Sequence, residues 1–358
     1  MAADFGFIRR LQVVSDRDVS RLHQHFLEPA EAFDATTMGN TRLFPLEMTW
    51  FYGEPIWHAL SPDQQLMLNR LTFCQSYLST AVAEAATNVL NYEAAVESFM
   101  SDDPAVGLYM AREVVEETTH LEAFFIIIRK VLAHYGLTLD QLRAANVSLR
   151  MATHYYRAHT LAAMLLGNLD FYYFTRFALN INQKTVERCA INEPNMHPCV
   201  RAILKNHAID EARHMQMSRE TGKLALARMR PRWLRNLACV LYAQFAANVY
   251  IGRHRKDSRL PRRTRIHTLA LCGVSPHLAE RAYLQWRDRV NQPTDPPLVR
   301  AGRAYYLRQN TAYIDELDVS PWLRAYMKRT VTRAYADAAD AERVGVRPLE
   351  FEELTRAS

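Results

Sequence analysis

The feature that most constrains this chain is the stretch His207-Ala-Ile-Asp-Glu211-Ala-Arg-His214. On an α-helix, positions i, i+4 and i+7 lie on one narrow stripe. The apolar residues between 200 and 204 occupy the same stripe, so a core-facing surface runs into three polar side chains. Polar groups inside a core cost several kcal/mol unless a partner satisfies them. Metal ions would do so; the alternative is a solvated face with coincidental spacing.

A second stripe of this kind extends from residue 106 to residue 131, in regular steps of three and four residues. It has apolar ends and a polar centre: Val106, Met110, Glu113, Glu117, His120, Phe124, Ile127 and Val131. Glu117-x-x-His120 and Glu211-x-x-His214 share one spacing, which lets a carboxylate and an imidazole bind the same ion. Two such pairs on separate long helices are typical of di-iron and di-manganese carboxylate bundles. The alternative is two core histidines paired with neighbouring glutamates.

Two further helices are expected to contribute one carboxylate each. Ser61-Pro-Asp-Gln64 predicts a helix start, and the helix would continue to about Asn91 with Glu84 on its inward stripe. A third long helix is predicted at about 152–182, followed by a loop at 183–198. Asp170 stands alone among apolar and aromatic residues on that third helix. The alternatives are an exposed edge position for Glu84 and a salt bridge from Asp170 to an arginine.

These stripes predict a site with seven metal ligands and one supporting acid. Four carboxylates balance the charge of two divalent ions in a core, and mixed carboxylate and imidazole ligation suits iron or manganese. The HExxH and HxxEH zinc-protease patterns are absent. The predicted ligands are Glu84, Glu117, His120, Asp170, His207, Glu211 and His214, with Glu113 behind them.

Composition bounds the rest of the interpretation. The chain has 358 residues, 49% of them hydrophobic, and only 11 glycines. We expect one helical domain over 1–358, with a metal-binding core at about 61–230 and additional helices at about 231–345. A net charge of +6 without a basic-aromatic motif does not indicate nucleic acid. Five cysteines without a CxxC pair, no signal peptide and no apolar run of about 20 residues favour a cytoplasmic protein without a membrane span.

Several segments of the chain together carry a family resemblance. They are Tyr52-Gly-Glu-Pro, Trp57–Gln75, Glu84, the EETTH stretch at 116–120 and the HAIDEARH stretch at 207–214. In these segments the chain resembles the di-iron arylamine N-oxygenases. The p-aminobenzoate N-oxygenases are the type example, and the resemblance covers about residues 45–230. The histidine four residues before the last glutamate is its specific mark. The resemblance implies an all-α, ferritin-like four-helix bundle with extra terminal helices. The family has a further glutamate on its third helix, and Asp170 is predicted to replace it. Asp210 resembles the family's acid that supports a ligand histidine across the bundle; the alternative is a solvated acid.

The resemblance also implies the chemistry. Two iron ions, or a manganese and iron pair, would reduce O2 and pass one oxygen atom to a substrate amine, which we expect to be an aryl amine in a biosynthetic pathway. No flavin or nicotinamide motif is evident, so an external electron donor is expected. The substrate is a small amine, free or bound to a carrier protein. The aromatic residues 171–174 would line a pocket or simply fill the core.

Other functions stay open at this stage. They are a di-iron oxidase or hydroxylase acting on carbon, a radical-generating subunit like that of ribonucleotide reductase, and a non-catalytic iron-binding protein. The basic stretch 253–265 is expected to be a solvated loop or a docking site for an acidic partner. Aromatic segments at 237–251 and 305–313 suggest the interface of a homodimer, and the tail after residue 346 is expected to be loose.

Overall fold

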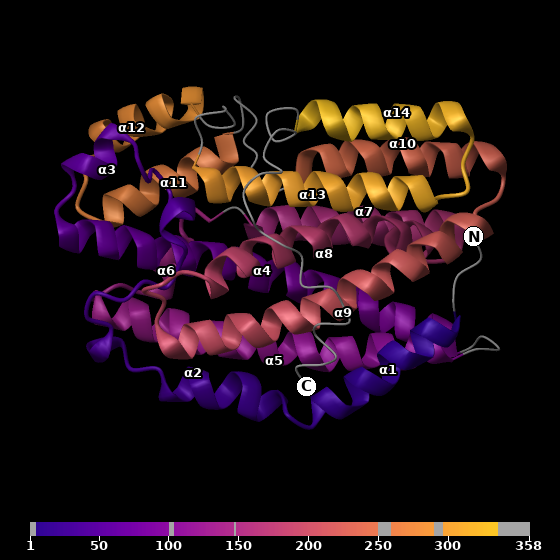
Figure 1. The fold of residues 1–358 in the computed structure, drawn as a ribbon, viewed down its shortest axis with the longest axis horizontal. Helices are drawn as coiled ribbons and strands as arrows, with labels where there is room; N and C mark the ends of the chain where they lie inside the picture. The colour runs from indigo at the N-terminus through magenta and orange to yellow at the C-terminus, as the bar shows by residue number, and fades with distance from the viewer. Residues whose placement is uncertain (1–4, 100–103, 147, 250–258, 290–295, 336–358) are drawn as a thin grey trace.

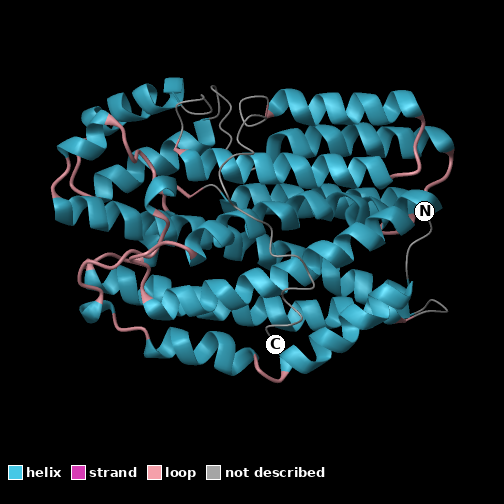
Figure 2. Cartoon of the chain, viewed as in Figure 1, coloured by secondary structure: helices cyan, strands magenta, loops and turns pink. Residues whose placement is uncertain are grey.

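The computed structural model describes residues 5–99, 104–146, 148–249, 259–289 and 296–335. Every regular element in these ranges is helical, and the single β-bridge, between Arg42 and Met196, is isolated (Figure 2). The all-α class is therefore confirmed. Among the described residues, no helix is both long enough and apolar enough to cross a membrane. The division into a core and additional helices stays a prediction.

Four long helices form the centre of the molecule (Figure 1). They are α4 (Pro62–Phe99), α5 (Ala105–His134), α8 (Asp170–Ile191) and α9 (Pro198–Arg228). Helix α4 packs along α5, α8 packs along α9, and α5 also contacts α9. Short connections make each pair antiparallel. This bundle brings side chains from distant parts of the sequence to one level of its interior.

Helix α4 begins where the sequence predicts. The Ser61 hydroxyl accepts a hydrogen bond from the Gln64 backbone N–H, and the Gln64 side chain accepts one from the Ser61 N–H. This reciprocal arrangement satisfies two donors that a helix start otherwise leaves unbonded. The helix then runs to Phe99, about two turns beyond the predicted end. Glu84 lies in its middle and is buried, so the exposed-edge alternative is wrong.

The prediction of one third helix at about 152–182 is wrong. The structure has two helices here, α7 (Ser148–Leu166) and α8, separated at Gly167. Gly167 has φ +71, a left-handed conformation that glycine adopts without steric cost and that ends a helix. Helix α8 then continues to Ile191, so most of the loop predicted at 183–198 is helical. This difference decides which carboxylate reaches the site.

Shorter helices cover the bundle on two sides. The N-terminal cover consists of α1 (Phe5–Val19), the π-helical turn η1 (His23–Leu27) and α2 (Glu28–Ala32). The short helix α3 (Pro55–Ala59) precedes α4. The remaining elements are 3-10 turns at Ala35–Thr37 and Leu46–Met48, α6 (Leu139–Arg143), α10 (Arg232–Val249), α11 (Arg259–Leu271), α12 (Pro276–Arg289), α13 (Pro297–Glu316) and α14 (Pro321–Ala334).

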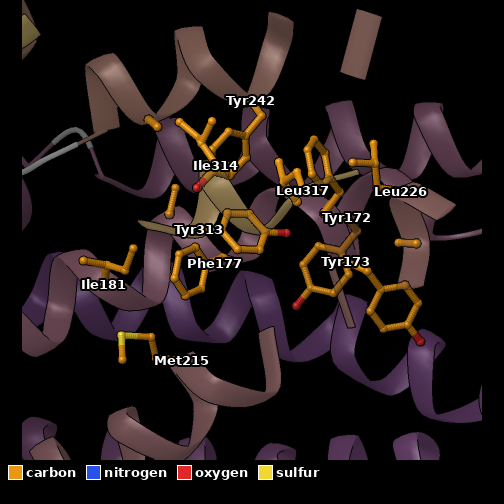
Figure 3. Close-up of a cluster of buried hydrophobic side chains, with 14 of the residues drawn as sticks. Tyr172, Tyr173, Phe177, Ile181, Met215, Leu226, Tyr242, Tyr313, Ile314 and Leu317 are labelled. Atoms are coloured by element: carbon orange, nitrogen blue, oxygen red, sulfur yellow. The ribbon is translucent and has the colours of Figure 1, made fainter. Parts of the chain in front are cut away.

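An aromatic core joins the bundle to α10 and α13 (Figure 3). Tyr313 of α13 packs against Phe177 of α8 and against Tyr242 of α10, and all three side chains are buried. Tyr305 is also buried, so the prediction that 305–313 offers aromatic side chains to a dimer interface is wrong. Residues 172–174 are core residues as well, which is the plainer of their two interpretations. Residues 250–258 and 336–358 lie outside the described ranges.

Gly222 on α9 makes room for Tyr313, and this contact gives a test of the packing. A Cβ at position 222 would overlap with the Tyr313 hydroxyl oxygen. We expect Gly222→Ala to lower the free energy of unfolding by about 1–3 kcal/mol, as overpacking of a core does. Tyr313→Phe removes that oxygen, so the double variant should recover much of the loss in urea unfolding. Simple additivity of the two single effects would contradict this contact.

Candidate metal centre

The centre of the site is the Glu117 carboxylate, which faces two histidines from two helices. Its Oε2 lies 3.2 Å from His120 Nδ1 on the same helix, and its Oε1 lies 3.0 Å from His214 Nδ1 on α9. His214 Nδ1 is also 3.4 Å from Glu211 Oε1. The i, i+3 spacing places each glutamate beside the histidine of its own helix. The two Glu-x-x-His pairs therefore meet face to face in the bundle interior.

His207 closes the group on the side of α4 and α8. Its Nε2 is 3.4 Å from Glu84 Oε1 and 3.8 Å from Glu211 Oε1. Its Nδ1 hydrogen-bonds the Glu187 carboxylate of α8. All three imidazoles are fully buried, and each of the four carboxylates is at most 8% exposed. The four long helices thus each supply at least one acid or imidazole to the same group.

Two more acids support the histidines in a crossed arrangement. Asp210, which precedes Glu211 on α9, accepts from His120 Nε2 of α5 at 2.9 Å. Glu116, the residue before Glu117 on α5, bonds His214 Nε2 of α9 at 2.8 Å. The buried Arg213 guanidinium donates to both acids, at 2.7 Å and 3.0 Å. With Nε2 engaged from behind, each ring turns Nδ1 toward the centre.

A further set of buried polar contacts surrounds Glu113, one helical turn before Glu117 on α5. Arg176 of α8 donates to the Glu113 carboxylate, which also accepts from Asn91 Nδ2 at 3.1 Å. The Tyr172 hydroxyl donates to the Asn91 amide oxygen. Arg176 thereby balances the charge of Glu113. Glu113 also lies close enough to Glu117 and His214 to form one possible ligand group with them.

The donor atoms fit metal ions. Among the described residues, three groups of side chains could each hold a metal ion. Within each group the ligand atoms lie within 4.8 Å of one another, and Glu117 belongs to all three groups. They are Glu117, His120 and His207; Glu84, Glu117, His207 and Glu211; and Glu113, Glu117 and His214. Both oxygens of Glu84 and Nε2 of His207 are buried without a hydrogen-bond partner. Buried polar atoms without a partner are costly, and bound cations would satisfy these.

Electrostatics of the group point the same way. Burial alone lowers the pKa of His120, but its bonds to Asp210 and Glu117 raise the pKa to about 9. Burial likewise lowers the pKa of His207 and His214, and the facing carboxylates raise both well above the ordinary value. The metal-free site therefore holds protons on its imidazoles to offset its carboxylates. Metal binding requires neutral imidazoles, so it would release these protons.

The structure does not place Asp170 in this group. Its Oδ1 accepts from Arg228 Nε at 3.0 Å, near the end of α9. Asp170 begins α8, whereas Glu187 lies in its last turns, so about 25 Å of helix separates them. The predicted ligand role of Asp170 is therefore contradicted, and the salt-bridge alternative describes its environment. The other predicted residues, including Asp210 and Glu113, lie together.

Sequence reasoning missed Glu187 and Glu116. Glu187 falls outside a helix that ends at 182, but Asn180 and Glu187 are seven residues apart and both bond α9 side chains. A search along the continued stripe would have found it. Glu116 could have been found more simply, because it immediately precedes Glu117 just as Asp210 immediately precedes Glu211. These equal positions predict that each acid bonds the histidine of the other helix.

A comparison with protein-family models places the chain. The model described as p-aminobenzoate N-oxygenase AurF matches residues 27–282. The chain belongs to this family. The match extends from η1 and α2 to α12 and includes every residue of the buried group. Neither the curated proteins nor the solved structures give a match.

Family membership makes the protein an enzyme, a di-iron oxidoreductase of the N-oxygenase type. The buried acids and imidazoles agree with this assignment, because they form groups that could hold metal ions. The matched range is also wider than the resemblance at about 45–230 seen in the sequence. It takes in α2 and the pair α11 and α12.

The metal-free protein offers a test of the charge balance. Burial and the nearby Glu117 carboxylate raise the pKa of Glu84 from 4.5 to about 7. The folded state then keeps a proton that the unfolded state releases, so the contribution of Glu84 is fully present below pH 4.5 and is lost as the pH rises through 7. Glu84→Gln does not titrate. We expect it to gain about 3 kcal/mol over the wild type across this range in urea unfolding.

The control is Asp63→Asn, an exposed acid on the same helix. Its difference from the wild type should stay nearly constant with pH. If the gain from Glu84→Gln is also independent of pH, the Glu84 carboxylate is not held in the environment described here.

Proposed function

We propose that this protein uses two iron ions and O2 to oxidise the nitrogen of a small aryl amine. The proposed ligands are Glu84, Glu117, His120, Glu187, His207, Glu211 and His214, with Glu187 in the role first assigned to Asp170. Asp210, Glu116 and Arg213 support them from behind. Family membership supports the type of reaction, while the substrate class and the ligand set are the proposal.

One observation carries the two-ion assignment. The two oxygens of Glu117 face different histidines, His120 on one side and His214 on the other. A carboxylate in this position could help to hold two cations, one on the side of His120 and one on the side of His214. The four carboxylates that face the histidines are Glu84, Glu117, Glu187 and Glu211. Their charge matches that of two divalent ions.

The overall reaction consumes one amine, one O2, two electrons and two protons, and it yields a hydroxylamine and one water. The bound ions would supply O2 activation and the transfer of one oxygen atom. The protein itself holds the ligands of the ions in place and excludes bulk water from the site. Asp210 and Glu116 fix which imidazole nitrogen faces the centre, and the near-complete burial of the group keeps bulk water away.

A second function has one observation in its favour. Tyr77 is buried beside the site, where burial and the Glu187 and Glu84 carboxylates raise its pKa well above the ordinary value. A radical-generating protein needs a tyrosine in such a place. Electron paramagnetic resonance after O2 exposure separates the two functions. A stable tyrosyl signal lost in Tyr77→Phe would favour the radical function, and its absence together with amine-dependent O2 uptake favours N-oxygenation.

Metal content tests the corrected ligand set. After anaerobic loading, we expect about two irons per chain in the wild type and in Asp170→Asn, because Asp170 pairs with Arg228. Glu187→Ala should lose about one iron or bind it at least tenfold more weakly. Equal loading of Glu187→Ala and the wild type would remove Glu187 from the ligand set, and a loss in Asp170→Asn would restore the original prediction.

Substrate class is tested by single turnover. Protein loaded with iron and chemically reduced is mixed with O2 and either 4-aminobenzoate, another aryl amine or an alkyl amine. We expect about one hydroxylamine per site from aryl amines, identified by mass spectrometry with oxygen-18 from O2. Glu117→Ala is the matched negative control. Label incorporated into carbon instead of nitrogen would assign the protein to the carbon-oxidising alternative.

A further inference from the structure

The helices α10 and α14 form a strongly basic surface, which we call the basic face. They lie side by side along one edge of the molecule (Figure 1) and contact each other along their length. Neither 232–249 nor 321–334 contains an Asp or a Glu. The cations of the face are Arg230, Arg232, Arg235, Arg324, Lys328, Arg329 and Arg333. Such an unbalanced surface attracts a partner of opposite charge.

Nearby acids do not cancel this charge. Asp318 Oδ2 lies 3.3 Å from Arg235 Nη2, and Asp315 Oδ2 lies 2.7 Å from Lys328 Nζ. Within the described part of the chain, Arg232, Arg329 and Arg333 form no ion pair with an acid, and all three are exposed. These three arginines are therefore available to an external partner.

Two hollows mark the ends of the basic face. The first has a volume of about 470 Å³ and is lined by Arg230, Arg232, Arg235, Asn236, Asp318, Val319 and Ser320. The second has a volume of about 550 Å³, and its lining includes Gln244, Asn248, Tyr326, Arg329 and Arg333. Each can accept acidic side chains of a partner. Together they extend the contact over most of both helices, which is the scale of a protein and not of a small ion.

Large apolar side chains lie on the same helices. Trp233 is 64% exposed, Trp322 is 62% exposed, and Leu237 and Leu241 are 44% and 43% exposed. Each tryptophan is the second residue of its helix. Exposed tryptophan beside arginine is the composition of binding hot spots between proteins. The basic face therefore fits an acidic protein that also offers apolar contact.

The position of the face in the fold indicates what kind of acidic protein it is. Tyr242, on the inner side of α10, has its ring centre 5.5 Å from that of Tyr313, which lies 4.3 Å from Phe177 of α8 (Figure 3). The neighbouring Arg176 bonds Glu113, which lies beside Glu117 and His214. Packed aromatic and polar side chains thus connect the basic face with the candidate metal centre.

We infer that the basic face docks a small acidic electron-transfer protein, of the reduced ferredoxin or flavodoxin class. This rests on the proposed function, whose balance needs two electrons from outside the chain for each amine oxidised. A donor of this class delivers one electron in each encounter, so two reduced donors would dock in turn for each amine oxidised. In each encounter the donor's iron–sulfur cluster or flavin is oxidised by one electron, the ions held by the candidate metal centre would accept that electron, and the oxidised donor then leaves. Arginines steer the encounter, and the tryptophans hold the complex.

The test uses the full chain, loaded with iron and then oxidised with O2 so that the site can accept electrons, and a reduced plant-type [2Fe–2S] ferredoxin. Binding is measured by calorimetry, and reduction of the site is followed optically under anaerobic conditions without amine. The test variant is Arg232→Glu with Arg329→Glu, because neither side chain forms an ion pair or a hydrogen bond within the described part of the chain. The matched control is Arg129→Glu with Arg157→Glu on α5 and α7, which reverses two exposed charges elsewhere. Reduction by dithionite reports whether each variant is intact.

We expect the test variant to raise the Kd for ferredoxin at least roughly tenfold and to slow site reduction by ferredoxin in proportion. The control variant should change the Kd and the rate of site reduction each by less than about twofold. Dithionite should reduce the site at the same rate in the wild type and in both double variants. Salt near 0.5 M should weaken wild-type binding and remove most of the difference. Trp233→Ala should weaken binding mainly through faster dissociation.

Three results would overturn the inference. The first is wild-type protein that shows no saturable, salt-sensitive binding of either reduced ferredoxin or reduced flavodoxin. The second is an equal effect of the two double variants. The third is loss of binding to phosphatidylserine vesicles in the test variant while ferredoxin binding is unchanged, which would make the face a membrane surface. A protein that accepts electrons from ferredoxin through this face but oxidises no amine would uphold the docking site and count against the proposed function alone.

Discussion

The structure depends on keeping several carboxylates and imidazoles in a dry helical core. Glu84, Glu117 and Glu211 face three fully buried histidines, and without metal ions their charge is compensated by protons on the rings and, below about pH 7, by a proton on Glu84. Such an arrangement is expensive, since each buried charge must be offset at close range. The bundle tolerates it because long apolar seams lie on both sides of the polar level. Function and stability therefore conflict at one level of the bundle.

The crossed supports explain how this level keeps its geometry. Asp210 and Glu116 each reach from their own helix to the histidine of the other, and Arg213 joins the two acids. A shift of α5 along α9 would break both links at once. The register of the two helices and the orientation of the two imidazoles are thus set by one network.

Much of the site could be predicted from the sequence, because helical periodicity fixes which residues share a face. Two Glu-x-x-His pairs on inward stripes were sufficient to locate Glu117, His120, Glu211 and His214. Asp170 could not be judged in this way. Its isolation among apolar residues is equally expected for a partner of Arg228, a contact between residues 58 positions apart that no local pattern records. Glu187 was missed because a left-handed glycine at 167 moves the helix boundaries toward the C-terminus.

The fold likewise divides into features that local sequence signals predict and features that depend on contacts between helices. Capping residues located the start of α4, and composition gave the all-α class. The placement of Tyr305 and Tyr313 in the core depended on α13 packing over α8, which is a tertiary contact. Local signals therefore determined elements and faces, while partners between helices had to come from the structure.

The most direct test of the account is anomalous X-ray scattering at the iron edge from crystals of the iron-loaded protein. The account predicts two peaks in the bundle interior, one on each side of the Glu117 carboxylate, with His120 nearest to one peak and His214 nearest to the other. A single peak, or iron bound away from Glu117, would contradict it.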